Sequence, residues 1–285
     1  MATILDGKAL AQKIQSQLQQ RVENLRHHSG IIPGLAVVLV GNDPASAVYV
    51  SNKEKAALKI GMKSEIVRLH ERSGETEILL AVKQLNERSD IHGIIVQMPL
   101  PAGTSTEKII QTINPAKDAD GLHPQNLGAL CWGGGMRAPR PCTPLGIMTL
   151  LDSHTISCQG KHAAVLGRSA IVGKPMALML LERHATVTIC HSRTPDLQTE
   201  VKRADILVVA IGVAQKVQGD WLKPGAVVVD VGMNRLNGKL VGDVDFDSTA
   251  KVASAITPVP GGVGPMTVTM LLANTIAIAE RNLIL

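Results

Sequence analysis

Aromatic side chains are nearly absent from this chain of 285 residues, which has two tryptophans, one tyrosine and one phenylalanine. Proteins that bind single-stranded nucleic acids rely on stacking bases against aromatic rings, so no nucleic-acid partner is expected. Cysteine is also scarce, and none of the four cysteines forms a Cys-x-x-Cys pair. We therefore expect reduced thiols in a cytoplasmic protein and no bound metal.

Long apolar runs and repeats of fixed period are missing as well. The longest apolar segment, residues 268–279, is interrupted by Asn274 and Thr275 and is too short to span a bilayer. The N-terminus lacks the basic and then apolar pattern of a secretory signal, so no membrane association is expected. A net charge of +5, with scattered lysines and arginines, suits an anionic small molecule as well as a polyanion.

Apolar runs alternate with helical patterns along the whole chain. The runs at residues 35–40 and 93–98 show no polar alternation, which is typical of parallel strands covered on both faces. Predicted strands lie at 35–40, 66–69, 93–98, 163–166, 186–190, 206–211 and 226–231. Predicted helices lie between Asp6 and Gly30, then up to Ile60, and at 75–86, 106–113, 144–153, 175–183, 196–203 and 266–281.

Residues 115–144 are rich in Gly, Pro, Asp and Asn and hold little periodic pattern, so we place a domain junction there. The alternation on either side predicts an α/β protein of two domains. Residues 1–140 form the first α/β domain. Residues 141–265 form a second domain with a Rossmann-type parallel sheet.

The second domain opens with an apolar run that breaks at Gly167 and resumes as a helix near Pro175. A strand, a glycine turn and a helix start together present backbone N–H groups to a phosphate. The spacing, Gly167-x-Ser169-x-x-x-Gly173, departs from the usual Gly-x-Gly-x-x-Gly pattern. On this stretch alone, an ordinary tight turn remains open.

Basic and hydroxyl side chains follow the first two strands of this domain, where a Rossmann-type sheet binds a dinucleotide. Arg168 lies inside the glycine turn, and Ser192 and Arg193 follow the second strand of this domain. No acid follows that strand until Asp196, which favours NADP over NAD. A solvated basic loop is the alternative. Met233, in the turn after a later strand, offers its backbone to the same cleft.

In the first domain, Tyr49 and Lys53 are four residues apart on a predicted helix and share a face. A lysine partly buried beside a tyrosine is a candidate acid–base group, although a surface lysine packed on the ring is the simpler interpretation. Gln97 lies at the C-terminal end of a buried strand, where α/β sheets place ligand sites, and an amide satisfied by the backbone is the alternative. Asp118 and Asp120 lie in a turn-rich loop, and turn formation alone would explain them.

Six motifs occur in order: Tyr49-Val-x-x-Lys53, Val96-Gln-Met-Pro-Leu-Pro101, Lys117-Asp-x-Asp-Gly-x-His-Pro124, Arg140-Pro-Cys-Thr-Pro144, Gly167-Arg-Ser-x-x-Val-Gly-x-Pro175 and Pro258-Val-Pro-Gly-Gly-Val-Gly-Pro-Met-Thr267. Together they make the chain closely resemble the bifunctional methylenetetrahydrofolate dehydrogenase/methenyltetrahydrofolate cyclohydrolase family, over essentially its full length. Small departures are Ala119, Leu122 and Gln125, and a stretch from Trp132 to Gly135 that looks slightly lengthened.

The resemblance implies that residues 266–285 complete the first, catalytic domain, that folate lies between the domains, and that the protein is a homodimer. It implies NADP-dependent oxidation of 5,10-methylenetetrahydrofolate, followed by hydrolysis of the methenyl product to 10-formyltetrahydrofolate. The implied catalytic residues are Lys53, Tyr49, Gln97 and Asp120. Further substrate contacts would come from Val96, Met98, Pro260, Gly261, Gly262, Val263 and Gly264. NADP contacts would come from Gly167, Arg168, Ser169, Ser192, Arg193 and Met233.

Two other functions stay open from the residues themselves. One is a dehydrogenase of small hydroxy or keto acids with a similar two-domain plan, in which Gln97 and the loop at 260–262 have no evident task. The other is a nucleotide-binding module without catalysis. The intact set of Tyr49, Lys53, Gln97 and Asp120 argues against that module, because binding alone needs no acid–base group.

Overall fold

The structure, a computed structural model, describes residues 2–133 and 138–283. Gly134 and Gly135, the end of the stretch singled out at Trp132, lie outside the described residues. Backbone contacts divide the chain into two compact units. Unit 1 contains residues 1–12 and 143–267, and unit 2 contains residues 13–142 and 268–285.

Unit 1 is built on a six-stranded parallel sheet in the order β1-β11-β8-β7-β5-β6. Its strands are β1 (Thr3–Ile4), β5 (His162–Leu166), β6 (Thr186–Cys190), β7 (Ile206–Val209), β8 (Val227–Asp230) and β11 (Ala255–Ile256). The strands β5, β7 and β8 are buried almost throughout, which matches their unbroken Val, Leu, Ile and Ala sequence.

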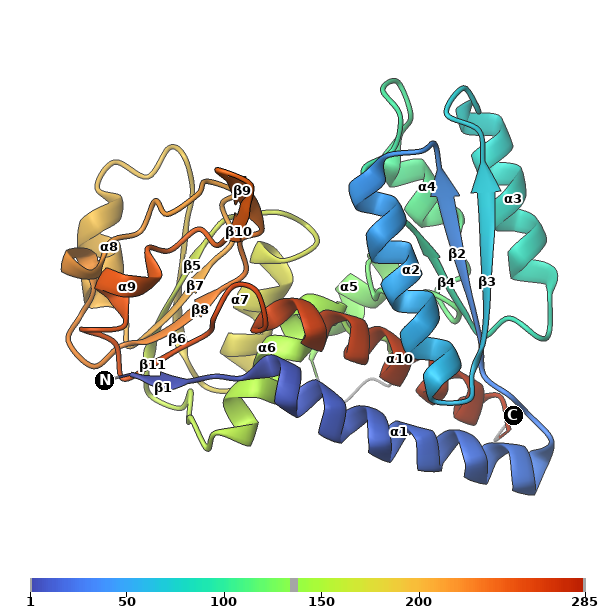
Figure 1. The fold of residues 1–285 in the computed structure, drawn as a ribbon, viewed down its shortest axis with the longest axis horizontal. Helices are drawn as coiled ribbons and strands as arrows, with labels where there is room; N and C mark the ends of the chain where they lie inside the picture. The colour runs from blue at the N-terminus through green and yellow to red at the C-terminus, as the bar shows by residue number, and fades with distance from the viewer. Residues whose placement is uncertain (1, 134–137, 284–285) are drawn as a thin grey trace. The chain divides into compact units, whose positions relative to one another are not determined.

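Helices cover both faces of this sheet (Figure 1). They are α6 (Cys142–Ser153), α7 (Gly173–Glu182), α8 (Leu197–Arg203) and α9 (Phe246–Thr249), with the short 3-10 helix η1 (Gly219–Trp221). Val201 of α8, Leu207 of β7 and Val228 of β8 belong to one core cluster on one of these faces. A small antiparallel pair, β9 (Asn234–Leu236) and β10 (Lys239–Val241), projects after β8.

Unit 2 contains a three-stranded parallel sheet in the order β3-β2-β4. Its strands are β2 (Gly34–Val40), β3 (Lys63–Leu69) and β4 (Gly93–Val96), and its helices are α2 (Pro44–Lys59), α3 (Glu75–Glu87), α4 (Thr106–Thr112) and α5 (Pro124–Trp132). Most of α1 (Gly7–Ser29) and of α10 (Val263–Arg281) also belongs to it. Ile78, Val82 and Ile109 pack α3 and α4 against the central strand β2.

Most predicted elements are present with ends displaced by a few residues, and the predicted α/β fold class is confirmed. The structure differs between residues 115 and 144, where helix α5 interrupts a stretch expected to hold little regular structure. Pro124 at the helix start and the His123 side chain, which accepts the N–H of Gln125, explain where this helix begins. The short elements β1, β9, β10, β11 and α9 were not predicted, because two to four residues carry no periodic pattern.

Residues 1–12 were expected with the first domain, but they belong to unit 1. The reason is backbone pairing, since β1 lies parallel to β11 with Thr3 opposite Ala255. The N–H of Lys8 also donates to the carbonyl of Gly261 over 2.8 Å. The inner boundaries of the units, at 142/143 and 267/268, lie close to the expected ones.

Helix α10 is longer than the apolar segment expected there. With 19 residues and a mean hydropathy of 1.3, it is the one helix among the described residues that is long and apolar enough to cross a membrane by length and composition alone. Inside the protein, 61% of this window is buried. Thr275 donates to the carbonyl of Leu271, and Asn274 is also buried with its amide bonded, so α10 is part of the core.

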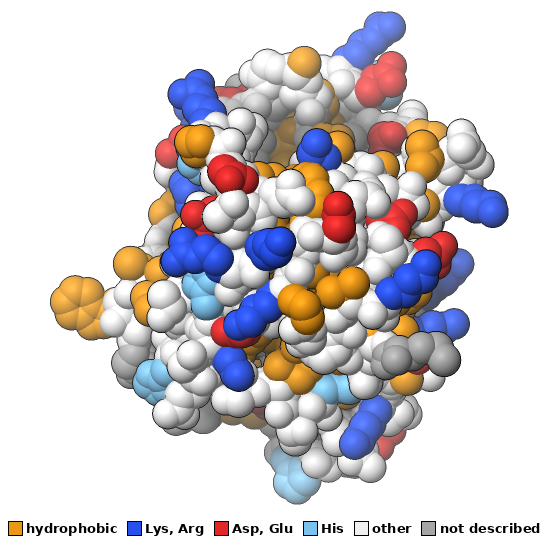
Figure 2. All heavy atoms as spheres, turned by 90° about the vertical axis from the view of Figure 1, so that its left-hand side faces the viewer, with side chains coloured by type: hydrophobic (Ala, Val, Ile, Leu, Met, Phe, Trp, Pro, Cys, Tyr) orange, Lys and Arg blue, Asp and Glu red, His pale blue; other side chains and the backbone are white. Residues whose placement is uncertain are grey.

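Lysine and arginine side chains are interspersed with aspartate and glutamate on the face shown in Figure 2. This face therefore carries charges of both signs side by side. Within unit 1, ion pairs join Lys223 to Asp205 and Arg183 to Asp152.

Candidate functional site

Helix α2 carries Tyr49 and Lys53 directly after β2. The helix starts where it does because Pro44 opens the first turn and the Asp43 carboxylate accepts the N–H of Ser46 over 2.7 Å. That backbone hydrogen bond also lowers the pKa of Asp43. Four residues of helix then place Tyr49 and Lys53 on one face, with Tyr49 39% exposed and Lys53 half-buried.

Helix α2 and the end of β4 bring Lys53 and Gln97 together. The Lys53 Nζ atom donates to Gln97 Oε1 over 2.9 Å. Gln97 is fixed in turn, because its backbone N–H donates to the carbonyl of Val38 and its side-chain Nε2 donates to the carbonyl of Met98. The first bond fixes the backbone of Gln97 and the second fixes its side-chain amide, so the amide oxygen is held toward the Lys53 Nζ atom.

Asp120 lies in a loop whose shape is set by its neighbour Asp118. The buried Asp118 carboxylate accepts the N–H groups of Gly121 and His123 and the side-chain amide of Asn126. Burial raises the pKa of Asp118. These bonds assign Asp118 to loop structure, in agreement with the turn-forming interpretation, and they leave the half-buried Asp120 as the loop's candidate binding carboxylate.

Cys142 and Asn274 both form hydrogen bonds to the backbone of the Asp120 loop. The sequence analysis gave neither residue a role. The Cys142 thiol donates to the carbonyl of Ala119 over 3.2 Å, and the Asn274 amide donates to the same carbonyl over 2.9 Å. Burial, and then the charge and hydrogen bond of Asp120, raise the pKa of Cys142 well above its usual range. Asn274 interrupts an apolar helix, and that interruption was the available signal.

The glycine-rich loop at residues 258–264 belongs to unit 1 and leads into α10. Its turn is closed by the N–H of Gly262, which donates to the carbonyl of Pro258 over 2.9 Å. Gly262 and Val263 are buried, whereas Pro260 and Gly264 are exposed. This loop can therefore contact a ligand through its exposed main chain, in line with its lack of acid–base side chains.

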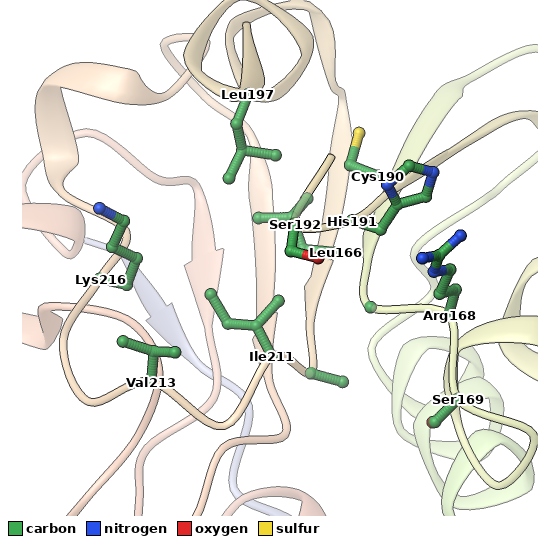
Figure 3. Close-up of a pocket in the computed structure, with 12 residues that line it drawn as sticks. Leu166, Arg168, Ser169, Cys190, His191, Ser192, Leu197, Ile211, Val213 and Lys216 are labelled. Atoms are coloured by element: carbon green, nitrogen blue, oxygen red, sulfur yellow. The ribbon is translucent and has the colours of Figure 1, made fainter. Parts of the chain in front are cut away.

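A pocket of about 430 Å³ lies at the carboxyl ends of β5, β6 and β7 in unit 1 (Figure 3). Its wall combines residues 166–169 after β5, residues 190–192 after β6, and Ala210, Ile211, Val213 and Lys216 after β7, with Leu197 from α8. Parallel α/β sheets bind ligands at this edge. Gly167, Arg168, Ser169 and Ser192, four of the predicted cofactor residues, line the pocket.

Gly167 and Gly173 are required by close approach of the backbone. Gly167 has a φ of +115°, and a Cβ atom there would overlap the carbonyl oxygen of Ala210. A Cβ atom at Gly173 would overlap the carbonyl oxygen of Gly167. Ser169 Oγ accepts the N–H groups of Val172 and Gly173, so this hydroxyl shapes the turn and occupies two donors at the start of α7.

Two predicted cofactor residues, Arg193 and Met233, are not among the pocket-lining residues. Both lie in exposed turns, Arg193 after β6 and Met233 after β8. The pocket instead contains His191 and Lys216, which were not predicted. Figure 3 shows Lys216 and Arg168 on opposite sides of the pocket. The position of a loop after β7 was the available signal for Lys216, because strands β5 and β6 end at the same edge.

The pocket's chemistry fits an anionic dinucleotide. Arg168 and Lys216 are cations, Ser169 and Ser192 offer hydroxyl groups, and Leu197 and Ile211 provide apolar surface. The lining contains no aspartate or glutamate, the residue type that would bind ribose hydroxyls in an NAD site. Among the described residues, no three His, Cys, Asp or Glu side chains are grouped so that they could hold a metal ion.

Two segments of the chain match the domain profiles of one protein family. Residues 5–120 match the tetrahydrofolate dehydrogenase/cyclohydrolase catalytic domain, and residues 141–283 match the NAD(P)-binding domain of the same name. The chain is 55% identical to the bifunctional protein FolD of Streptococcus agalactiae, with 99% of both chains covered.

Solved structures agree with this likeness. The bifunctional FolD methylenetetrahydrofolate dehydrogenase/cyclohydrolase from Campylobacter jejuni is 47% identical, with a TM-score of 0.97 over 99% of this chain and 100% of that one. A Trypanosoma brucei enzyme of the same type, complexed with NADP cofactor and an inhibitor, is 40% identical, with a TM-score of 0.94 over 99% of this chain and 98% of that one.

The fold and the pocket define a two-unit α/β protein with a dinucleotide site on its larger parallel sheet. The matches identify it further: the chain belongs to the tetrahydrofolate dehydrogenase/cyclohydrolase family. The expected pairing of a dehydrogenase with a cyclohydrolase and the expected NAD(P)-type cofactor are thereby confirmed. The alternatives of a hydroxy-acid dehydrogenase and of a binding module are set aside.

Proposed function

We propose that this chain oxidises 5,10-methylenetetrahydrofolate to the 5,10-methenyl form with NADP, and then hydrolyses that product to 10-formyltetrahydrofolate. The hydrogen bond of 2.9 Å between Lys53 Nζ and Gln97 Oε1 is the observation that carries the proposal. A positioned amine with a fixed neighbour suits general acid–base work on a water molecule, and such help is worth about 10² to 10⁴ in rate.

NADP, when bound, accepts the hydride that leaves the one-carbon bridge. In unit 1, Gly167, Arg168, Ser169 and Ser192 would hold it at the pocket, and Arg168 supplies positive charge for phosphate. The lack of a carboxylate in the pocket lining supports NADP over NAD. Arg193 and Met233 remain proposed contacts from the neighbouring turns.

The dehydrogenase step needs positioning more than a base, because the oxidised bridge is a cation stabilised by its two flanking nitrogens. We assign this positioning to Tyr49 and Asp120, with Val96 and Met98 beside Gln97. The loop at 260–264 would contact folate through its backbone. Unit 2 is accordingly the catalytic domain and unit 1 the NADP domain.

The hydrolytic step uses the same residues differently. Lys53 takes one proton from the water that attacks the one-carbon bridge and returns it to the leaving nitrogen as the C–N bond breaks, and the second water proton passes to solvent as the formyl C=O bond forms. Gln97 orients the Nζ atom for both transfers of the first proton. Asp120 holds the pterin ring while this happens. Cys142 and Asn274 keep the Asp120 loop in place.

The reaction is tested by mixing the protein with methylenetetrahydrofolate and NADP and following the ultraviolet absorbance of the methenyl product. Absorbance that rises with NADP and then decays as hydrolysis proceeds supports the proposal, and no rise at all contradicts it. Lys53→Met should abolish the decay while NADP still binds. Lys55→Met, on the exposed side of the same helix, is the matched control and should behave as the parent.

We propose further that the protein is a cytoplasmic homodimer, on the basis of the family assignment and of four cysteines that are all free thiols. Light scattering of the purified chain tests the dimer. A mass of twice 30.2 kDa is expected, and a single-chain mass at micromolar concentration would contradict it.

A further inference from the structure

The loop between β7 and η1 forms one wall of the cofactor pocket although it contains neither helix nor strand. Ile211, Val213 and Lys216 of this loop line the pocket. An irregular segment needs other groups to satisfy its backbone and fix its shape. In this loop those groups come from the segment at residues 242–245, far along the chain.

Backbone bonds make the first connection between the two segments. The N–H of Gln215 donates to the carbonyl of Gly242 over 3.0 Å, and the N–H of Val217 donates to the carbonyl of Asp243 over 3.1 Å. The N–H of Asp245 donates back to the carbonyl of Val217 over 2.8 Å. These bonds fix the far end of the loop and leave the residues next to β7 to a side chain.

That side chain is Asp243, which is completely buried. Its Oδ2 atom accepts the N–H groups of Ile211 over 2.7 Å and of Gly212 over 2.9 Å. Its Oδ1 atom accepts the side-chain amide of Asn234 over 2.8 Å. Asn234 opens β9 directly after Met233, so one carboxylate binds both the pocket loop and the residue next to another proposed cofactor contact.

The position of Asp243 is itself fixed by a second buried carboxylate. Asp230, at the end of β8, accepts the N–H groups of Asp243 over 3.0 Å and of Val244 over 2.9 Å. It also accepts the N–H of Gly232 over 2.9 Å. Hydrogen bonds to an ionised acceptor are roughly twice as strong as neutral ones, so this arrangement holds the loop more firmly than neutral side chains would.

We propose that Asp243 is a positioning residue for the cofactor: through the N–H groups of Ile211 and Gly212, its carboxylate fixes the pocket wall before NADP enters. The inference rests on the proposed function, because it takes this pocket as the NADP site. A wall that is already ordered costs the cofactor no ordering entropy on binding. Loss of the carboxylate therefore acts on affinity, and the hydride step at saturating NADP is largely spared.

The test measures NADP affinity by calorimetric titration, with KM and kcat of the dehydrogenase reaction. Asp243→Ala leaves the part-buried N–H groups of Ile211 and Gly212 without their acceptor. We expect Kd and KM for NADP to rise about tenfold while kcat falls less than about threefold. Asp243→Asn keeps an amide oxygen toward both N–H groups, and Asn234 can accept its new N–H group by turning its own amide oxygen inward, so affinity should return to within about threefold. Asp247→Asn changes an exposed acid of α9, two residues beyond that segment; it is the matched control and should match the parent.

The outcomes separate the inference from the proposed function. If the parent chain does not bind NADP, the proposed function fails. If the parent binds NADP and Asp243→Ala binds it equally well, the positioning role of Asp243 is wrong. A fall in kcat that matches the rise in KM, with no recovery in Asp243→Asn, would also overturn it. Should Asp243→Ala not fold, Asn234→Ala decides: the role requires KM for NADP to rise about threefold, and an unchanged KM contradicts it.

Discussion

Three of the four candidate catalytic residues of unit 2, Tyr49, Lys53 and Gln97, stand on or next to regular elements, whereas the pocket of unit 1 is walled mainly by loops. Lys53 lies on helix α2 and Gln97 directly follows strand β4, so helix and strand geometry alone bring Nζ and Oε1 within 2.9 Å. The unit 1 pocket depends on Gly167, on the loop after β7, and on a buried carboxylate 32 residues along the chain from Ile211. In unit 2, regular elements therefore place reactive side chains, whereas in unit 1 the shape of the pocket depends on the main chain of its loops.

The largest effect should come from adding one methyl group to the glycine turn of unit 1. Gly167→Ala places a Cβ atom against the carbonyl of Ala210 at a φ of +115°, and we expect a loss of about 4 kcal/mol of unfolding free energy. Urea denaturation measures it. Gly238→Ala, at a φ of +78° with no atom close to the added Cβ, should lose only about 1 kcal/mol. Equal losses of unfolding free energy in the two variants would show that the close contact of Gly167 with the Ala210 carbonyl does not affect stability.

A second effect concerns the buried carboxylates that hold the unit 1 loops. Burial raises the pKa of Asp230 from 3.8 to about 6, so the folded protein holds a proton there that the unfolded chain has lost. Stability from this group is full below pH 4 and is lost as the pH rises to about 6. A pKa difference of this size corresponds to about 3 kcal/mol of unfolding free energy.

The measurement is the unfolding free energy of the parent minus that of Asp230→Asn, from pH 4 to 7. We expect this difference to fall by about 3 kcal/mol with rising pH. Asp205→Asn provides the opposite sign when the series is extended below pH 4, because the bond from Lys223 lowers the pKa of Asp205 below 3.8 and its stabilisation is lost only as the pH falls below that value. If the difference between the parent and Asp230→Asn does not change with pH, the raised pKa of Asp230 does not contribute to the stability of unit 1.

A smaller effect, on the rate of hydrolysis, is expected from the bond that orients Lys53 in unit 2. Gln97→Leu removes the acceptor of Lys53 Nζ, and kcat for methenyltetrahydrofolate hydrolysis should fall about tenfold to a hundredfold, with NADP affinity unchanged. Gln97→Glu retains an acceptor and should recover part of the rate. Gln111→Leu, at an exposed position on α4, is the control. A parental hydrolysis rate in Gln97→Leu would separate Gln97 from the chemistry.

The same contrast explains what could be predicted from sequence. Tyr49 and Lys53 share a helix face at a spacing of four, and Gln97 follows an apolar strand, so periodicity alone brought them to notice. For Lys216 the only signal was the position of its loop after β7, and for Asp243 there was none, because hydrogen bonds to distant residues set the shape of these loops. The helix α5 and the pairing of β1 with β11 were missed for a related reason, since short elements are fixed by their neighbours.

Separate location of the two functions is tested most directly by taking two readouts on each of two variants. Lys53→Met and Arg168→Met are each assayed for methenyltetrahydrofolate hydrolysis without cofactor and for NADP affinity by titration. We expect Lys53→Met to lose about 10² to 10⁴ in hydrolysis at parental NADP affinity. Arg168→Met should lose about tenfold in NADP affinity at parental hydrolysis. Loss of both functions together in either variant would contradict the account.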